Sequence, residues 1–541
     1  MKRLLPLGIQ DFVSIRERGF VYVDKTARIH EWLTGSGKPF FLSRPRRFGK
    51  SLLCSTLEAV FEGRRELFGE IAGRPALAIN SLDWEWKKHP VIRLDLNAGD
   101  YINDGMAALH GTLGYQLHVQ AEKHGIELPP EYNHSNQFAY LIRKAHEKTG
   151  VQAVVIIDEY DKPLLETIDD VAINGKIRGA LKNFYGILKS SDSHLRFLFL
   201  TGVTKFSKVS IFSDLNQLSD LTLDSGYADI CGVTQEELEQ NFGSEIETIL
   251  ESTGKSREEY MENLRDYYNG YRFSKKPLKV YNPFGLLHHF DQCGDFFPYW
   301  YETSTPTFLI KLVTDQKIDI ANLSDMRVDY SDFRKYDVEN MKAEPVLYQS
   351  GYLTITNYNE EDEEFTLDYP NIEVRSSFTK SLLKQYLQAP ENVSAALISK
   401  LPKALRNGDI DEVINVLRQY MAGVPYDVIE KTENYYRTVV HLVFNALGLN
   451  CRSEVRIADG RIDTIVETKN YVYCFEFKLD KTADEALEQI DTKEYLLPWT
   501  GSGKKLFKVG VNFDSEKRNI GEWKYKTARR SIGLEHQSQN L

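Results

Sequence analysis

The seven residues from Val151 to Ile157 constrain the fold of this chain more than any other segment. They read Val-Gln-Ala-Val-Val-Ile-Ile and are apolar at nearly every position. Such a run is typical of a strand buried on both faces, and hence of a parallel sheet covered by helices. Further strands are predicted at 39–44, 91–96 and 195–200, with helical stretches between them. This alternation predicts an α/β domain over about residues 1–235.

The bulk properties narrow the class of protein. A chain of 541 residues is too long for one core and is expected to form two or three domains. Its net charge of −11 argues against binding of polyanions over the whole surface. The basic stretch 504–530 could still form a local patch that binds nucleic acid. The five cysteines show no metal or disulfide spacing, which favours a reducing cytoplasm. No apolar run approaches the ~18–20 residues of a membrane span, and no signal peptide is evident.

The rest of the chain divides into two further regions. A capping box, Thr234-x-x-Glu237, opens a helical region at 236–424. Within it, a helix and a hairpin at 343–370 suggest a winged-helix module. This module would either read DNA, which its acidic tip at 359–363 disfavours, or act as a lid that packs on the first domain. A third, α/β domain is expected at 425–541, with these elements: helices at 433–447 and 482–496 and strands at 462–467, 471–478 and 507–513.

A basic loop, Arg44-Pro45-Arg46-Arg47-Phe48-Gly49-Lys50-Ser51, joins the first predicted strand to a helix at 51–61. This context favours a phosphate loop, whereas no strand precedes Gly254-Lys255-Ser256. Backbone N–H groups of the loop and the helix N-terminus would face the phosphates of a nucleotide. Lys50 is predicted to reach the β- and γ-phosphates, and the Ser51 hydroxyl to bind magnesium.

Two features of the loop and its surroundings refine this hypothesis. Arginine stands at position 44, where the standard motif begins with glycine. The loop arginines either touch phosphates or tie the loop to acidic neighbours. Asp158, at the end of a buried strand, would hold magnesium through its water, and Glu159 would polarise the attacking water. Thr201 or Thr204 could sense the γ-phosphate. The predicted nucleotide-binding set is Arg44, Arg46, Arg47, Phe48, Gly49, Lys50, Ser51, Asp158 and Thr201.

A second cluster lies near the C-terminus, at Glu476-Phe477-Lys478. Residues two apart on a strand share a face, so Glu476 and Lys478 point the same way. The turn 468–470 would bring Asp463 of the preceding strand beside them. Clustered carboxylates suit magnesium or manganese, and Lys478 could orient a nucleophile. The alternative is an ordinary half-exposed strand with a solvated face.

Four segments together resemble the bacterial AAA-ATPase-like family, in which a C-terminal PD-(D/E)XK nuclease-like domain is commonly fused: 22–26, 44–51, 157–161 and 201–206. The resemblance implies a P-loop ATPase with an added lid and a nuclease-fold tail. It assigns Asp463, Glu476 and Lys478 to the three defining nuclease positions. Glu433 matches an extra acidic metal ligand, and Gln489 a glutamine of related nucleases.

This sequence departs from the nuclease pattern at two positions. Ile462 replaces a proline, and Lys493 stands where a tyrosine is expected four residues after Gln489, with Tyr495 two residues further on.

The expected function is ATP binding and hydrolysis coupled to a magnesium- or manganese-dependent nuclease domain that acts on nucleic acid, with DNA favoured. The alternative is a nucleotide-controlled binding or signalling module whose nuclease-fold tail is catalytically inactive. The two differ in whether purified protein cuts nucleic acid. The sequence leaves open the choice between DNA and RNA, assembly into a homo-oligomer, and the supply of an arginine by a neighbouring subunit.

Overall fold

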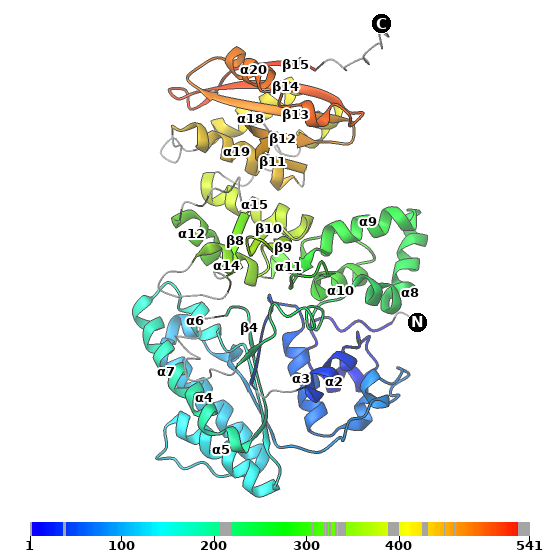
Figure 1. The fold of residues 1–541 in the computed structure, drawn as a ribbon, viewed down its shortest axis with the longest axis vertical. Coiled ribbons are helices and arrows are strands. Elements are labelled where there is room, and N and C mark those ends of the chain that lie inside the picture. Colours follow the sequence, from blue (N-terminus) through cyan, green and yellow to red (C-terminus); the bar gives the residue numbers. More distant parts are fainter. Residues whose placement is uncertain are drawn as a thin grey trace, which may run out of the picture. The chain divides into compact units, whose positions relative to one another are not determined.

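The computed structural model describes most of the chain, namely residues 3–35, 39–205, 218–303, 307–316, 318, 320, 323, 326–330, 333, 342–387, 400–424, 431–447, 450–457 and 460–528. Phe206, Arg529 and Arg530, which belong to the segments singled out above, lie outside these residues. The chain forms two compact units (Figure 1). Unit 1 comprises 1–309 and 327–371, and unit 2 comprises 310–326 and 372–541. The three-domain division with boundaries at 235 and 424 stays a prediction.

Unit 1 is built on a parallel sheet of five strands in the order β2-β3-β4-β1-β5. Every residue of the central strand β3 is buried, as its unbroken apolar sequence predicts. The four predicted strands are confirmed. Their bounds are β1 (Pro39–Ser43), β2 (Val91–Asp95), β3 (Ala153–Asp158) and β4 (Leu195–Gly202), with the short β5 (Ser219–Asp220) added at the edge.

Helices cover both faces of this sheet. Figure 1 shows α4, α5 and α7 on one side, and α2 and α3 on the other. Trp32 of α2 anchors the second side, since its ring packs on Phe40 of β1 and Phe199 of β4. The helices are α1 (Phe12–Glu17), α2 (Thr26–Thr34), α3 (Lys50–Phe61), α4 (Tyr101–His124), α5 (His134–Thr149), α6 (Lys162–Glu166) and α7 (Val171–Ser190).

The remainder of unit 1 is largely helical and begins with the predicted capping box. Thr234 and Glu237 bond each other's backbone N–H groups at the start of α8. The predicted hairpin is also present, because β9 and β10 pair antiparallel, with β8 added beside β10. The elements are α8 (Gln235–Thr253), α9 (Arg257–Tyr268), β6 (Tyr271–Arg272), β7 (Lys279–Val280), α10 (Pro283–Asp291), α11 (Tyr299–Glu302), β8 (Met326–Asp329), α14 (Ala343–Gln349), β9 (Thr354–Asn359) and β10 (Glu364–Asp368).

The helix and hairpin at 343–370 pack on the first domain. Gly351, which follows α14, has φ +90°, and an added Cβ would lie 2.8 Å from the Pro45 ring. The Gln349 side chain also accepts a hydrogen bond from the Lys205 backbone N–H at 3.0 Å. These contacts favour the interpretation of this segment as a covering element over its interpretation as a DNA reader.

Unit 2 contains a mixed sheet in the order β11-β12-β13-β14-β15. Only the β13–β14 pair is parallel. Helix α19 packs against β11, β12 and β13, and α20 packs on the other face of the sheet (Figure 1). The bounds are α12 (Thr307–Asp315), α15 (Ile372–Leu387), α17 (Leu401–Asn407), α18 (Ile410–Ala422), α19 (Glu433–Ala446), β11 (Asn450–Ile457), β12 (Gly460–Glu467), β13 (Tyr471–Leu479), α20 (Ala483–Thr492), β14 (Lys505–Asp514) and β15 (Asn519–Thr527).

The two outer strands, β11 and β15, were not predicted, because both carry mostly polar residues. The five cysteines are unpaired. Within the described residues, no helix combines the length and the apolar character that crossing a bilayer requires.

Candidate functional site

The loop between β1 and α3 carries the predicted phosphate-binding residues and enters the helix through a left-handed glycine. Gly49, the residue before α3, has φ 94°, a left-handed conformation that glycine adopts without strain. Lys50 is only 3% exposed, and its Nζ donates to the carbonyls of Arg44 and Pro45, both at 3.1 Å. The ammonium group therefore lies beneath the loop, 3.5 Å from a carboxylate oxygen of Glu159.

Arg44 holds the loop in place rather than facing a ligand. Its side chain is fully buried and donates to the carbonyls of Ser43 (2.8 Å), Thr222 (2.9 Å) and Tyr227 (3.0 Å). Its guanidinium also lies 4.3 Å from the centre of the Phe273 ring. In this structure the guanidinium therefore bonds to backbone carbonyls and, among the residues described, forms no ion pair with an acidic neighbour. Phosphate contact by Arg44 stays a prediction that this arrangement does not favour.

The remaining loop residues divide between solvent and core. Arg46 and Arg47 are exposed, so their side chains are free to reach an anion, although Arg47 also lies over the Phe284 ring. Phe48 is buried against Tyr271 at 4.7 Å between ring centres. The Trp300 indole N–H donates to the Arg46 carbonyl at 2.9 Å. Residues 271–300 thus fix the outer side of the loop.

Asp158 ends β3 at the same sheet edge as the loop. It has no exposed surface, and its Oδ2 meets no hydrogen-bond donor within the described part of the chain. Burial, followed by the charge of Glu159, raises the pKa of Asp158 to about 6, and a hydrogen bond from the Ser51 side chain opposes this rise. A buried carboxylate oxygen without a donor fits the ligand set of a divalent cation.

Glu159 follows at a strained position. Its φ of 51° is uncommon for a residue with a side chain, and such strain concentrates at functional sites. Its backbone N–H donates to Oδ1 of Asp158 at 3.0 Å. This turn directs the Glu159 side chain to Lys50.

The two threonines proposed as γ-phosphate sensors are already engaged. The Thr201 hydroxyl donates to the Leu42 carbonyl at 2.8 Å and is fully buried. The Thr204 hydroxyl donates to Asp161 at 2.7 Å. Both hydroxyls tie neighbouring strands or loops together, so this structure does not bring either one forward as a sensor. Asp161 was not singled out from the sequence, because only the fold shows that it also accepts the Val203 and Thr204 backbone N–H groups.

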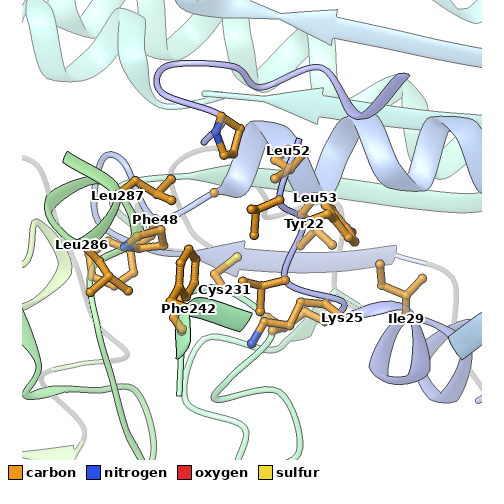
Figure 2. Close-up of a pocket in the computed structure, with 18 residues that line it drawn as sticks. Tyr22, Lys25, Ile29, Phe48, Leu52, Leu53, Cys231, Phe242, Leu286 and Leu287 are labelled. Carbon is orange, nitrogen blue, oxygen red and sulfur yellow. The ribbon is translucent and has the colours of Figure 1, made fainter. Parts of the chain in front are cut away.

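A cavity of about 110 Å³ adjoins the loop, and Figure 2 shows the side chains that line it. Its wall is mostly apolar and comes from three separate parts of unit 1: residues 6–29, the loop with the start of α3, and 230–287. Tyr22, Leu53 and Cys231 are typical of this wall. Lys25 lies at the cavity with its ammonium bound to Glu237 at 2.6 Å. Sequence reasoning missed this cavity, because its wall joins segments more than 200 residues apart.

The second candidate site is in unit 2, on β12 and β13. Thr464 pairs with Phe475, so Asp463 and Glu476 are the next residues along the two strands. The Asp463 Oδ2 accepts a hydrogen bond from the Phe477 backbone N–H at 2.8 Å, and Lys478 Nζ lies 2.8 Å from Glu476 Oε1. The structure therefore brings together the three residues that the sequence predicts. Asp463 is the fourth residue of β12, because this strand begins at Gly460 and not at the predicted position 462.

Burial dominates the electrostatics of this site. It raises the pKa of Glu476 to about 8, and the charge of Asp463 adds to the rise. Burial also raises the pKa of Asp463. Burial alone would lower the pKa of Lys478, but the hydrogen bond with Glu476 raises it overall. Within the described residues, Glu476 Oε2 is buried without a donor, like Asp158 Oδ2 in unit 1.

The other residues that the resemblance assigns are nearby, with one difference from the expected ligand set. Glu433 begins α19, and its charge reaches both Asp463 and Glu476. Yet among the residues that the structure describes, no three acidic, histidine or cysteine side chains stand together as a metal cluster. Arg437, one turn after Glu433, lies 3.7 Å from Asp463. Asp463 and Glu476 are thus neighbours across the β12–β13 pair, and the described residues do not complete a cluster of three with Glu433.

Tyr495 lies beside Gln489 in the fold, although it stands two positions after the expected one in the sequence. Gln489 of α20 donates to the Tyr495 hydroxyl at 3.0 Å. The helix ends at Thr492, and Glu494 adopts φ 48°, so the chain turns back there. Tyr495 thereby takes the place that a continuous helix would give to position 493.

The fold and both sites define a class: an α/β protein with a phosphate-loop unit and a separate unit that carries a carboxylate–lysine strand pair. Comparison with known families agrees. Residues 6–212 match a family described as predicted AAA-ATPase, and residues 431–523 match the PD-(D/E)XK nuclease superfamily. A protein of Azotobacter chroococcum mcd 1, named "Uncharacterized protein in vnfD 5'region", is 36% identical over 530 residues, which cover 96% of this chain and 98% of that protein.

The chain therefore belongs to the family of AAA-ATPase-like proteins that carry a C-terminal domain of the PD-(D/E)XK nuclease superfamily. The predicted fold class is confirmed in both parts.

The role of Arg44 can be tested by substitution. We expect Arg44→Ala to lower the free energy of unfolding by about 3 kcal/mol, because it leaves buried carbonyls without donors. The measurement is urea-induced unfolding followed by fluorescence. Arg46→Ala, which removes an exposed arginine from the same loop, should change stability by less than about 0.5 kcal/mol. Equal stability of the two variants, with ATP binding lost only in Arg44→Ala, would instead make Arg44 a phosphate ligand.

The raised pKa of Glu476 predicts a pH-dependent stability. Because the folded-state value is about 8, the contribution of this group to stability is complete below the ordinary pKa of 4.5 and is lost as pH rises through 8. In EDTA, Glu476→Gln should therefore unfold at a higher temperature than the wild type at pH 9 and match it near pH 4.5. Thermal unfolding between these values measures the effect.

Glu467 provides the control for this experiment. Hydrogen bonds from Trp499, Lys504 and Arg452 outweigh its burial and lower its pKa, so its contribution is lost as pH falls. Glu467→Gln should therefore be less stable than the wild type at neutral pH. A Glu476→Gln profile parallel to the wild type over the whole range contradicts the assignment.

Proposed function

We propose that this protein binds and hydrolyses ATP in unit 1 and cuts nucleic acid, most simply DNA, with a metal-dependent site in unit 2. One observation carries the proposal: each unit buries a carboxylate with one oxygen that accepts no hydrogen bond in the described structure, Asp158 in unit 1 and Glu476 in unit 2. A lysine contacts Glu476 itself in unit 2, and in unit 1 a lysine contacts Glu159, the residue after Asp158. Such an oxygen is suited to a divalent cation, and the lysine is suited to a phosphate. A chain of this kind would break a phosphoanhydride bond in unit 1 and a phosphodiester bond in unit 2.

In unit 1, the loop would receive the phosphates and the adjoining cavity the base. The cavity volume of about 110 Å³ is well below the ~300–1,000 Å³ of pockets that enclose a whole ligand, so it suits one flat ring system. Its apolar wall favours a base over a sugar or phosphate (Figure 2). Gly49 lies both in the cavity wall and in the loop. A base in the cavity would therefore lie directly beside phosphates in the loop.

Ser51 and Asp158 would hold magnesium, which supplies charge neutralisation at the β- and γ-phosphates. The protein's own residues do the rest. Lys50 lies 3.5 Å from Glu159, so a γ-phosphate that attracts the ammonium would leave Glu159 free to orient water. Exposed Arg46 and Arg47 could add charge at the loop mouth.

In unit 2, Asp463 and Glu476 would hold a magnesium or manganese ion, with Glu433 as a further ligand after a side-chain rotation. The ion supplies polarisation of a scissile phosphate. Lys478 would hold the attacking water by hydrogen bonding and offset negative charge on the phosphate. The Gln489–Tyr495 pair provides polar groups on the adjoining helix and turn, and the charges of Glu476 and Asp463 act on Tyr495.

The second candidate is a nucleotide-controlled binding module with an inactive tail. One observation favours it: Arg437 lies 3.7 Å from Asp463, and Lys478 contacts Glu476, so cations of the protein already neutralise both carboxylates. A site arranged in this way could grip a phosphate without a metal. Both proposed functions are compatible with assembly into a homo-oligomer and with an arginine supplied by a neighbouring subunit.

Substitution of Lys50 tests the ATP site. Lys50→Ala removes charge-assisted bonds to phosphate, each worth ~1.5–3 kcal/mol, and should weaken ATP binding about 10- to 100-fold. Calorimetric titration with a non-hydrolysable ATP analogue measures the change. Lys255→Ala, in the other Gly-Lys-Ser tripeptide, is the matched control and should bind normally. Equal affinities of the two variants would remove the loop from the proposal.

Cleavage assays test the nuclease site. Full-length protein with manganese should nick a supercoiled plasmid or cut a single strand. Asp463→Ala and Lys478→Ala should reduce the rate by about 100-fold or more, as expected for loss of a group that stabilises the transition state. Lys469→Ala, on the turn between β12 and β13, should cut at the wild-type rate. Intact ATP turnover without cleavage of any tested substrate would favour the binding module.

A further inference from the structure

Unit 1 contains a second cavity, of about 650 Å³, which no step above uses. Part of its wall comes from Val91, the first residue of β2, from Pro90 before it, and from Val151, two residues before β3. The strands of a parallel sheet all run the same way, so this is the edge opposite to the phosphate loop. The volume lies within the ~300–1,000 Å³ that is usual for small-molecule sites. The cavity is thus large enough for a ligand and separate from the nucleotide site.

Cationic side chains dominate the wall. Arg64, Lys88 and Lys123 carry three positive charges, and Glu62 is the acidic member. Lys88 is exposed, and within the described residues its ammonium has no ion pair or hydrogen bond. The Arg64 guanidinium also forms ion pairs with two exposed glutamates that do not line the cavity, Glu66 at 3.2 Å and Glu17 at 3.6 Å. An anion that entered the cavity would therefore meet at least one cation that is free to bind it.

Two histidines add acceptor groups. His89 Nδ1 lies 2.9 Å from the Gln152 carbonyl, and His124 Nε2 lies 3.0 Å from the Val91 carbonyl. Burial lowers the pKa of both rings, so both are neutral at pH 7. Because a carbonyl only accepts, these nitrogens carry the protons and the other nitrogen of each ring is an acceptor. The wall thus suits a molecule that bears both an anionic group and hydroxyl groups.

A chain of ion pairs runs from this cavity to the nucleotide site. Lys123 Nζ lies 2.8 Å from Glu62 and 2.8 Å from Glu58. Glu58 continues to Arg93 at 3.3 Å, and Arg93 to Oδ2 of Asp158 at 3.8 Å. Arg93 also donates to the Ser51 carbonyl at 3.4 Å. Helix α3, which begins at Lys50, carries Glu58 and thereby spans the distance between the two sites.

We propose that the 650 Å³ cavity binds a small phosphorylated molecule with hydroxyl groups, and that the Lys123–Glu58–Arg93 chain couples its occupancy to Asp158. A phosphate attracts Lys123 and loosens its hold on Glu58. Glu58 then draws Arg93 away from Asp158, so less positive charge competes with a divalent cation there. The ligand therefore strengthens binding of the magnesium nucleotide. This coupling rests on the proposed ATP site, whereas binding in the cavity does not.

Calorimetric titration of the nucleotide-free, full-length protein with glucose 6-phosphate tests the cavity. Saturable binding is expected, and glucose itself should not bind. Lys88→Glu should weaken binding at least about tenfold, the effect of losing one charge-assisted bond and adding repulsion. Lys87→Glu makes the same charge change one residue outside the wall and should bind normally. No saturable binding, or equal losses in both variants, overturns the site.

The coupling is measured as the affinity for a magnesium-bound, non-hydrolysable ATP analogue with and without saturating glucose 6-phosphate. About fivefold tighter binding is expected, the low end for coupled sites. Glu58→Gln should still bind glucose 6-phosphate but lose this shift, whereas Glu122→Gln on the neighbouring helix should retain it. A shift that persists in Glu58→Gln, or is absent from the wild type, overturns the coupling. Failure of the analogue to bind at all removes the proposed ATP site and leaves the cavity result standing.

Discussion

A buried carboxylate that lacks a hydrogen-bond donor is the constraint on which both sites depend. Asp158 has no exposed surface and Glu476 is almost completely buried, yet in the described structure one oxygen of each meets no donor. Burial of such a group is unfavourable, and it raises the pKa of Asp158 to about 6 and that of Glu476 to about 8. A folded protein retains this cost most readily where a cation offsets it. Lys478 contacts Glu476 itself, whereas in unit 1 Lys50 contacts Glu159 and the Arg93 guanidinium lies 3.8 Å from Oδ2 of Asp158.

The parallel sheet of unit 1 explains how residues far apart in the sequence form one site. Strands β1 and β3 end at the same edge, so the loop after β1 and the acidic end of β3 meet there. The opposite edge holds the second cavity, and α3 runs between the two. In unit 2 the site residues come from strands that are adjacent in the sequence. A tight turn between β12 and β13 places Asp463 beside Glu476. In each unit the secondary structure brings the side chains of the site together.

Local sequence patterns predicted much of this arrangement. The apolar run of β3 needs burial on both faces, and the Glu476–Lys478 spacing needs only the alternation of a strand, so both could be predicted. The strands β11 and β15 could not, since their polar residues are held by neighbouring strands rather than by their own pattern. The sequence likewise predicted a strand, a loop and a helix at 39–61, but not the hydrogen bonds of Arg44 at the start of the loop.

Other features depend on contacts that no pattern encodes. Arg44 donates to carbonyls about 180 residues away, which turns a suspected ligand into an anchor. Tyr495 reaches Gln489 because α20 ends at Thr492, whereas the sequence predicts a helix that continues to 496. The ion pairs of Glu58, Arg93 and Lys123 join an α-helix, a strand and a second helix, and their spacing in the sequence gives no sign of it.

Anomalous diffraction from crystals grown with manganese and a non-hydrolysable ATP analogue tests the central claim most directly. Two peaks are predicted, one against Asp158 and Ser51 and one between Asp463 and Glu476. Density for the analogue with no manganese at either site would contradict the account, because the buried oxygens would then serve some purpose other than holding a cation.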